Sequence, residues 1–249
     1  MIRTILASAL LALGLNAPAR AAGIGDMTDT ERQVFRDEVR AYLLENPEVL
    51  MEAIAVLEQR QARAQAGNDA SLVKTNAQAI FDDGYSWVGG NPEGDVTLVE
   101  FMDYRCSYCR KAFDEVAQLV SEDGNIRFVV KEFPILGEQS LQAARFAIAT
   151  KKVAGDAAYK QVHDALMTMR GNVTDASLKA VAERFDLEPD PIMEKMDSDA
   201  VNAIIRKNRE LAQRLQISGT PTFVLEDRML RGYVPLENMQ EIVSEVRAD

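Results

Sequence analysis

The sequence predicts an α/β domain preceded by an N-terminal α-helical stalk, and three observations carry this prediction. First, the apolar run Val96–Phe101 lies shortly before two cysteines, and a helical pattern from Ala112 to Val120 follows them. Second, another apolar run, Ile126–Val130, follows that helix, so strand, helix and strand form a crossover typical of a parallel sheet. Third, residues 140–216 carry no strand pattern, although apolar residues recur there at helical spacing.

The first 21 residues have the pattern of a secretory signal peptide. Met1-Ile2-Arg3 is a short positive start, Thr4–Leu15 is an apolar run, and Ala19-Arg20-Ala21 is a small-x-small cleavage site. The apolar run is shorter than the roughly 20 residues that a membrane-spanning helix needs. We therefore expect a cleaved signal peptide over residues 1–21 and export to the periplasm, with a retained membrane anchor as the alternative.

The charge balance restricts the partners of the protein. The 249 residues include 28 Lys and Arg against 39 Asp and Glu, a formal net charge of −11. Cleavage of the signal peptide would remove Arg3 and Arg20 and make the mature protein still more acidic. Such a charge argues against nucleic acid or anionic lipid as a partner, and it suits an exported protein.

Residues 22–66 are expected to form the helical extension. A first helix has Phe35, Val39 and Tyr42 on one face, and Asn46-Pro47 ends it and begins a second helix. The second helix carries a narrow apolar stripe over Leu50–Leu57. A pair this thin cannot bury its stripe alone. It must pack either on the main domain or on copies of itself, and the pattern leaves both open.

The rest of the chain divides into a linker and a main domain. Gly67–Ser71 predicts a break, and residues 67–84 a linker with a short helix; the main domain then covers residues 85–249. The domain is expected to begin with a strand at Tyr85–Val88 and to carry a helical insertion over about residues 140–216. Its remaining predicted elements are five helices in the insertion, 141–150, 157–169, 176–185, 192–196 and 201–215, then a hairpin of strands 222–225 and 229–233, and a last helix 236–246.

The two cysteines, Cys106 and Cys109, are the strongest functional signal. A helix N-terminus stabilises a thiolate, so we expect Cys106 to be the exposed, attacking thiol and Cys109 the buried thiol that resolves the mixed disulfide. A metal site is one alternative, but four zinc ligands would be needed, and His163, the only histidine, lies far away in sequence. A structural disulfide is another, although so short a loop constrains the unfolded chain little.

Several other side chains could take part in the chemistry. Glu100 is an acid within an apolar strand, and it is either a buried proton acceptor for Cys109 or a solvent-facing strand residue. Lys131-Glu132 is expected to be a solvated pair, with a partner pair for Glu100 as the alternative, and His163 is expected to be a hydrogen-bonded histidine rather than a ligand. Asp103 and Tyr104 are expected to shape the loop before the cysteines. The methionines of the insertion are expected to fill the core, with an exposed copper(I)-binding cluster as the alternative.

A resemblance to a known family extends these expectations. The segment Phe101–Lys111, a long helical insertion and Gly219-Thr220-Pro221 before a hairpin resemble the DsbA-like branch of the thioredoxin superfamily. The stretch Tyr42–Leu50 is similar to the N-terminal extension of the suppressor-of-copper-sensitivity C group within it. The resemblance implies a thioredoxin fold with a helical insertion, a cis peptide bond at Pro221, and Thr220 as a substrate-contacting residue.

The resemblance also implies an activity, namely thiol–disulfide exchange on exported proteins through Cys106 and Cys109. It requires no cofactor or metal beyond that redox-active pair. Ser107 and Tyr108 lie between the cysteines and are assigned to substrate binding; they lack the histidine of strongly oxidising members. Thr220 stands where oxidising members tend to have valine. Both details favour a disulfide isomerase or reductase.

The partners implied are exported substrate proteins with cysteines, a membrane redox partner and two further copies of the chain in a homotrimer. Three alternatives stay open. They are a monomeric dithiol oxidase, a copper(I)-sequestering dithiol protein connected with copper tolerance, and a chaperone that holds substrates through the extension.

Overall fold

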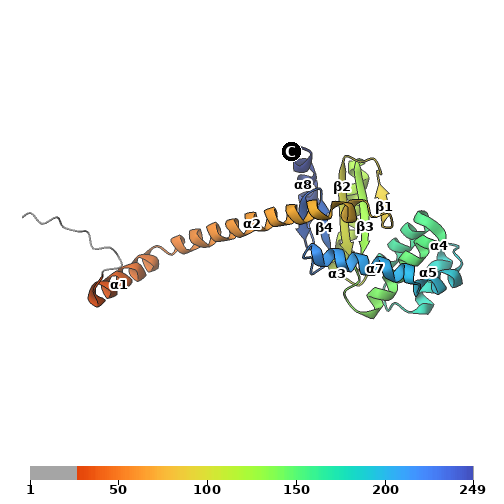
Figure 1. Ribbon diagram of the computed structural model, residues 1–249, viewed down its shortest axis with the longest axis horizontal. Coiled ribbons are helices and arrows are strands. Elements are labelled where there is room, and N and C mark those ends of the chain that lie inside the picture. The colour runs from red at the N-terminus through yellow and green to blue at the C-terminus, as the bar shows by residue number, and fades with distance from the viewer. Residues whose placement is uncertain (1–26, 249) are drawn as a thin grey trace, which may run out of the picture. The chain divides into compact units, whose positions relative to one another are not determined.

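The computed structural model describes residues 27–248 (Figure 1). The predicted signal peptide, residues 1–21, lies outside the described residues. The chain divides into two compact units whose border falls between Arg60 and Gln61. Within the described residues, no helix is long and apolar enough to cross a membrane.

The first unit contains helix α1 (Asp29–Glu45) and the beginning of α2 (Glu48–Phe81). Thr28 caps α1: its hydroxyl accepts a hydrogen bond from the backbone N–H of Glu31, and the carboxylate of Glu31 accepts one from the backbone N–H of Thr28. Asn46 ends α1, which confirms the predicted boundary between the two helices. No residue of α1 is buried, and Phe35, Val39 and Tyr42 are among its exposed apolar side chains.

The predicted break at Gly67–Ser71 is wrong, because α2 continues without interruption to Phe81. A glycine inside a helix costs only about 1 kcal/mol relative to alanine. The polar side chains of the segment also bind within the helix, since Gln65 donates to Asp69 and the hydroxyl of Ser71 donates to the carbonyl of Gly67. Asp69 is buried and accepts hydrogen bonds from Arg231, so a tertiary contact fixes this part of α2 as helix.

The second unit is built on a five-stranded mixed sheet with the strand order β1-β3-β2-β4-β5. Its central pair, β2 and β3, is parallel and is joined by the crossover helix α3, as the sequence predicts. All other pairs are antiparallel. The strands are β1 (Trp87–Gly90), β2 (Val96–Met102), β3 (Ile126–Glu132), β4 (Thr222–Leu225) and β5 (Arg228–Arg231).

Helices cover both faces of the sheet. Alternate residues of β2 point to opposite faces: Leu98 packs in one cluster with α3 and α8, whereas Val99 packs in another with α2 and α7. Since both faces are covered, most positions of β2 and β3 are buried, including the charged residues Glu100, Lys131 and Glu132. The helices of these layers are α3 (Ser107–Asp123), α7 (Asp199–Arg214) and α8 (Leu236–Ala248), together with the second half of α2.

A helical insertion separates β3 from β4, where the sequence predicts it (Figure 1). It comprises α4 (Glu138–Thr168), α5 (Asp175–Arg184), α6 (Pro189–Met196) and α7. Two of the predicted helices are joined as α4, which bends at Gly155. The backbone of Gly155 has a φ of 85°, a value that side chains disfavour and glycine tolerates.

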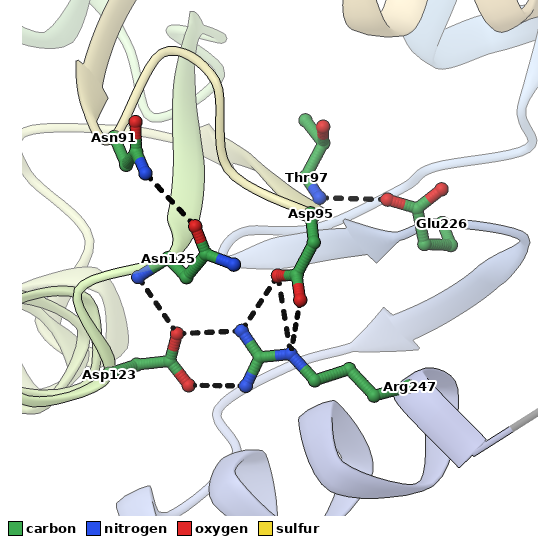
Figure 2. Close-up of polar contacts among 7 residues, drawn as sticks. All are labelled: Asn91, Asp95, Thr97, Asp123, Asn125, Glu226 and Arg247. Carbon is green, nitrogen blue, oxygen red and sulfur yellow. Dashed lines mark hydrogen bonds and ion pairs between the residues drawn. The ribbon is translucent and has the colours of Figure 1, made fainter.

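A polar cluster fastens the C-terminal helix to the sheet and to the end of α3 (Figure 2). Arg247 of α8 binds the carboxylate of Asp95 at 2.8 Å and that of Asp123 at 2.6 Å. Nearby, the side-chain amide of Asn91 donates to the side-chain oxygen of Asn125 at 3.0 Å. The cluster thus holds together the loops that follow β1 and α3.

Candidate active site

Cys106 occupies the N-cap position of α3, and a short loop, residues 103–105, joins it to the end of β2. The cap residue accepts hydrogen bonds from backbone N–H groups that the helix itself leaves unpaired. Here the sulfur of Cys106 plays that part, because it accepts a hydrogen bond from the backbone N–H of Cys109 at 3.5 Å. The strand therefore delivers the thiol to the positive end of the helix, as the sequence predicts.

This position makes Cys106 strongly acidic. A hydrogen bond from the thiol of Cys109 lowers the pKa of Cys106 to about 5; burial opposes this shift, and the side chain of Thr220 and the backbone N–H groups of Cys109 and Tyr108 add to it. At neutral pH Cys106 is a thiolate, which is the nucleophilic form. The prediction that Cys106 is exposed is wrong in degree, because only 7% of its surface is accessible. The cis-proline loop described below covers part of the sulfur.

Cys109 lies one turn further along α3 and is fully buried. Its hydrogen bond to Cys106, its burial and the nearby carboxyl of Glu100 all raise its pKa. Cys109 therefore keeps its proton while Cys106 is ionised. The two thiols thus differ as the sequence predicts, with the less buried one reactive and the more buried one held in reserve.

The loop before β4 closes the site on the other side. The peptide bond between Thr220 and Pro221 is cis, as expected from the resemblance. The sulfur of Cys106 lies 3.1 Å from the carbonyl oxygen of Thr220. Pro221 and Thr222 are buried, whereas Thr220 is half-buried and lines a small hollow beside the sulfur's loop.

Glu100 lies in β2, in the layer beneath the cysteines, and 4% of its surface is exposed. Burial raises the pKa of Glu100 to about 8, and the charges of Cys106 and Glu132 add to the shift. The structure thus bears out the buried-acid interpretation rather than the solvent-facing one. Of the residues between the cysteines, Tyr108 is 59% exposed and Ser107 is exposed as well, so both are accessible to a substrate.

Residues 97–244, which include Glu100, both cysteines and Pro221, match the family described as DSBA-like thioredoxin domain. The chain belongs to this family. Residues 31–64 match a second family, described as the copper resistance protein ScsC N-terminal domain, and this match covers α1 and the first half of α2.

Solved structures of the DSBA-like family and its neighbours agree with this assignment. A thioredoxin-like oxidoreductase from Silicibacter pomeroyi is 41% identical and covers 69% of this chain and 98% of its own, with a TM-score of 0.65. BcfH from Salmonella enterica Typhimurium is 28% identical and covers 87% and 96%, with a TM-score of 0.71. ScsC from Proteus mirabilis, in a transitional conformation, is 26% identical and covers 89% and 99%, with a TM-score of 0.65.

The curated relatives include much longer proteins. The Na⁺/H⁺ antiporter NhaA 1 of Salinispora arenicola is 30% identical over 186 residues, which make up 74% of this chain and 28% of the antiporter. The chain thus spans little more than a quarter of the length of that relative. Disulfide bond formation protein D of Bacillus subtilis is 23% identical over 164 residues, 73% of its length.

As a DSBA-like protein, the chain can carry out thiol–disulfide exchange with the groups described. The Cys106 thiolate attacks a sulfur of a substrate disulfide, and the other substrate sulfur leaves as a thiolate. Cys109, once deprotonated, attacks the mixed disulfide at the Cys106 sulfur and releases the second substrate thiol. The protein is oxidised by two electrons and the substrate disulfide is reduced; the reverse sequence oxidises a substrate dithiol.

The prediction that Lys131-Glu132 is a solvated pair is wrong, because both side chains are buried. They point to opposite faces of the sheet, since neighbouring strand residues alternate. Lys131 forms an ion pair with Asp83 beyond the end of α2. Glu132 instead accepts hydrogen bonds from the hydroxyl groups of Tyr104 at 2.7 Å and Tyr159 at 2.6 Å.

His163 belongs to the same buried network and confirms the expectation of a hydrogen-bonded histidine. Its Nδ1 lies 3.0 Å from the hydroxyl of Tyr104, and burial lowers the pKa of His163 to about 3, so that it is neutral. Asp103 shapes the loop as predicted: its carboxylate accepts hydrogen bonds from the backbone N–H groups of Arg105, Ile135 and Leu136. Across residues 27–248, no group of three or more His, Cys, Asp or Glu side chains is arranged to hold a metal ion.

Proposed function

We propose that the protein is an exported thiol–disulfide oxidoreductase that isomerises or reduces disulfides in exported proteins. The observation that carries the proposal is the Cys106 thiol, whose pKa is lowered to about 5 beside a Cys109 that keeps its proton. An isomerase needs a thiolate that attacks wrong disulfides and a second thiol that releases the enzyme when the mixed disulfide is not resolved by the substrate.

The surroundings of Cys106 favour a moderate oxidant. A pKa of about 5 lies between the values of about 7 in thioredoxin and about 3.5 in DsbA. Ser107 and Tyr108 supply no imidazole next to the sulfur, and the single histidine is neutral and bonded to Tyr104 instead. A less stabilised thiolate makes the disulfide form less oxidising, which suits shuffling better than one-way oxidation.

The first 21 residues support export to the periplasm, where disulfides persist. One relative is described as a periplasmic thioredoxin-like protein from Salmonella enterica serovar Typhimurium and is 28% identical. An isomerase in an oxidising compartment would have to be kept reduced, so the proposal includes a membrane redox partner that returns electrons to the Cys106–Cys109 pair.

The proposal also includes self-association, as a homotrimer, through the N-terminal helices. In α1, Phe35, Val39 and Tyr42 stand at helical spacing, and 41–52% of each side chain is exposed. The first part of α2 has a similar stripe, in which Leu50, Ile54 and Leu57 are 48–55% exposed. Contiguous exposed apolar surface of this kind is typical of interaction sites. The match of residues 31–64 to the ScsC N-terminal family covers both of these apolar stripes.

The test is refolding of scrambled ribonuclease by the mature protein in a redox buffer, with the native mass recorded in the same preparation. We expect recovery of ribonuclease activity by an oligomer and loss of that activity in Cys106→Ser. Rapid oxidation of reduced ribonuclease by a monomer that does not rescue the scrambled form would contradict the proposal.

A dithiol oxidase is the second candidate, and the low pKa of Cys106 itself favours it. A stabilised thiolate stabilises the reduced enzyme and so makes the disulfide form more oxidising. Equilibration with glutathione separates the two candidates. A potential near that of protein disulfide isomerase, about −180 mV, supports the isomerase, whereas one near that of DsbA, about −120 mV, supports the oxidase.

A further inference from the structure

A cavity of about 430 Å³ lies between α3, the strands β1 and β3, and α4. Much of its wall is apolar: α3 contributes Phe113, Val116 and Val120, and the sheet contributes Trp87 and Phe128. The three α3 residues recur at helical spacing, so one stripe of the catalytic helix faces the cavity along its length. A volume of this size and an apolar, aromatic lining are typical of sites for small molecules.

Glu100 is one of the polar residues that line this cavity. Its side chain lines the cavity, and its Oε1 atom has no hydrogen-bond partner within the described residues 27–248. Glu132 also has an unpaired oxygen, Oε2, but its Oε1 accepts hydrogen bonds from two tyrosines, and Glu132 does not line the cavity. An unpaired buried carboxyl oxygen costs free energy, and such groups call for a partner that the protein itself does not supply.

The charged groups around the cavity indicate what kind of partner fits. Glu100, Lys160 and His163 are the titratable residues that line it. His163 is neutral, and the ammonium group of Lys160 is engaged by Asp164. A cation would meet Lys160 in the same cavity, and an anion would meet the carboxyl of Glu100. A neutral head that both donates and accepts hydrogen bonds complements the carboxyl in either protonation state.

One part of the cavity wall is held in shape by hydrogen bonds and ion pairs. Asn91 and Gly124 line it, and Asn91 is bound to Asn125, the residue after Gly124. Arg247 fixes the adjoining end of α3 through Asp123 (Figure 2). This part of the wall therefore does not have to become ordered when a molecule enters, so binding does not pay that entropy cost.

We propose that this cavity binds a small neutral molecule with an aromatic or branched aliphatic body and an amide-like head, and that the head pairs with the carboxyl group of Glu100. The bound molecule would separate Glu100 from water. The charge of Glu100 acts on the thiol of Cys109. A molecule bound in the cavity would therefore slow the deprotonation of Cys109 and prolong the mixed disulfide. This regulatory consequence rests on the proposed function, whereas binding does not.

Binding is tested on the mature full chain carrying Cys106→Ser, so that the result does not depend on redox activity. The probes are benzamide, benzamidinium and benzoate, which have nearly the same shape and differ in charge. Calorimetry gives the affinity. The NMR signal of the Trp87 indole N–H reports whether the probe binds in the cavity, because Trp87 is the only tryptophan and lines it. We expect saturable benzamide binding that shifts this signal, and weaker binding of both charged probes.

Two substitutions on α3 form a matched pair for this experiment. Val120→Phe fills the cavity and should weaken benzamide binding by about tenfold or more. Gln118→Phe adds the same side chain on the exposed face of the helix and should leave binding unchanged. Glu100→Leu removes the polar partner and should abolish the preference for benzamide over toluene.

Three results would overturn the proposal. They are equal binding of benzamide, benzamidinium and benzoate, benzamide binding that Val120→Phe leaves intact, and no saturable binding of any probe.

If benzamide binds as expected, a saturating concentration should slow release of the mixed disulfide in the wild-type protein. If binding occurs and ribonuclease refolding is absent with and without benzamide, the ligand site stands and the proposed isomerase function fails.

Discussion

The sulfur of Cys106 lies 3.1 Å from the carbonyl oxygen of Thr220, although 114 residues separate the two in sequence. The contact joins the N-terminus of α3 to the loop before β4, and it leaves only 7% of the Cys106 surface exposed. A substrate cysteine that reaches the sulfur must therefore pass beside Thr220. This arrangement makes the chemistry of Cys106 depend on residues from both segments.

The first prediction concerns Thr220, whose side chain helps to lower the pKa of Cys106. In Thr220→Val this hydrogen bond is lost, so the pKa of Cys106 should rise by up to about one unit, the worth of one hydrogen bond. The rate of alkylation of Cys106 by iodoacetamide as a function of pH measures the midpoint. Thr168→Val, on an exposed position of α4, is the control and should leave the midpoint where it is. An equal shift in both variants would contradict the assignment.

The second prediction concerns Cys109, whose thiol is the largest cause of the low pKa of Cys106. Cys109→Ala removes this donor and should raise the pKa of Cys106 more than Thr220→Val does. Cys109→Ser keeps a hydroxyl donor and should raise it less. Both variants lack the resolving thiol, so both should accumulate mixed disulfides with a model substrate, visible by mass spectrometry. A pKa near 5 in the alanine variant would show that the helix N-terminus alone sets the acidity.

The cysteine site could be predicted from the sequence because its signals are local. The strand, the two cysteines and the helix are consecutive, and the N-cap geometry of Cys106 follows from that order. The cis bond at Pro221 came from a resemblance rather than from the residues, since a proline at a strand start also fits an ordinary turn. The parallel pairing of β2 and β3 likewise follows from the strand, helix, strand order.

The buried polar network could not be predicted in the same way, because its partners are distant in sequence. Glu132 binds Tyr104 and Tyr159, which are 28 and 27 residues away, and Lys131 binds Asp83, which is 48 residues away. Adjacent charged residues at the end of a strand usually indicate that this end is exposed to solvent. A sheet covered on both faces reverses this, and the long apolar run before Lys131 was the one local signal of such a strand.

The third prediction is a pH dependence of stability that arises from Glu100. Its pKa is about 8 in the folded protein and 4.5 in the unfolded chain, so the folded state binds more protons between these values. The contribution of Glu100 to stability is therefore complete below pH about 4.5 and is lost as the pH rises through about 8. Glu100→Gln removes this decline and should gain stability relative to wild type at the upper end of the window.

The measurement is urea unfolding followed by the fluorescence of Trp87, which reports the catalytic unit because it is the only tryptophan and is buried there. Glu132 has a pKa of about 8 as well and shares the window. The gain in stability over wild type at the upper end of the window should therefore be largest in the double variant Glu100→Gln, Glu132→Gln. Because the lowered pKa of Cys106 makes stability rise with pH in the same window, the test is the difference between variant and wild type, and a difference that does not grow from pH about 4.5 to about 8 would contradict the raised pKa values.

The fourth prediction concerns the buried ion pair between Lys131 and Asp83, whose side chains are 0% and 5% exposed. Lys131→Met leaves the Asp83 carboxylate buried without its partner and should cost about 3–5 kcal/mol of stability. Lys179→Met breaks the exposed pair with Asp190 and, as the control, should cost no more than about 1 kcal/mol. Denaturant titration with Trp87 fluorescence gives both values, and similar costs would show that burial of the Lys131 pair does not matter.

The last prediction tests self-association of the N-terminal helices. Phe35, Val39 and Tyr42 share one face of α1 and stay 41–52% exposed, so a second copy is the partner that would cover them. Phe35→Glu with Tyr42→Glu places charges on this face and should convert the oligomer to a monomer in sedimentation. Arg36→Glu with Arg40→Glu changes charge on neighbouring positions of the same helix without removing an apolar side chain, and it should preserve the oligomer. The monomeric variant should keep the Cys106 titration midpoint, because that site lies wholly within the second unit. If it also keeps full ribonuclease refolding activity, the catalytic unit isomerises disulfides alone, and the helices serve another purpose.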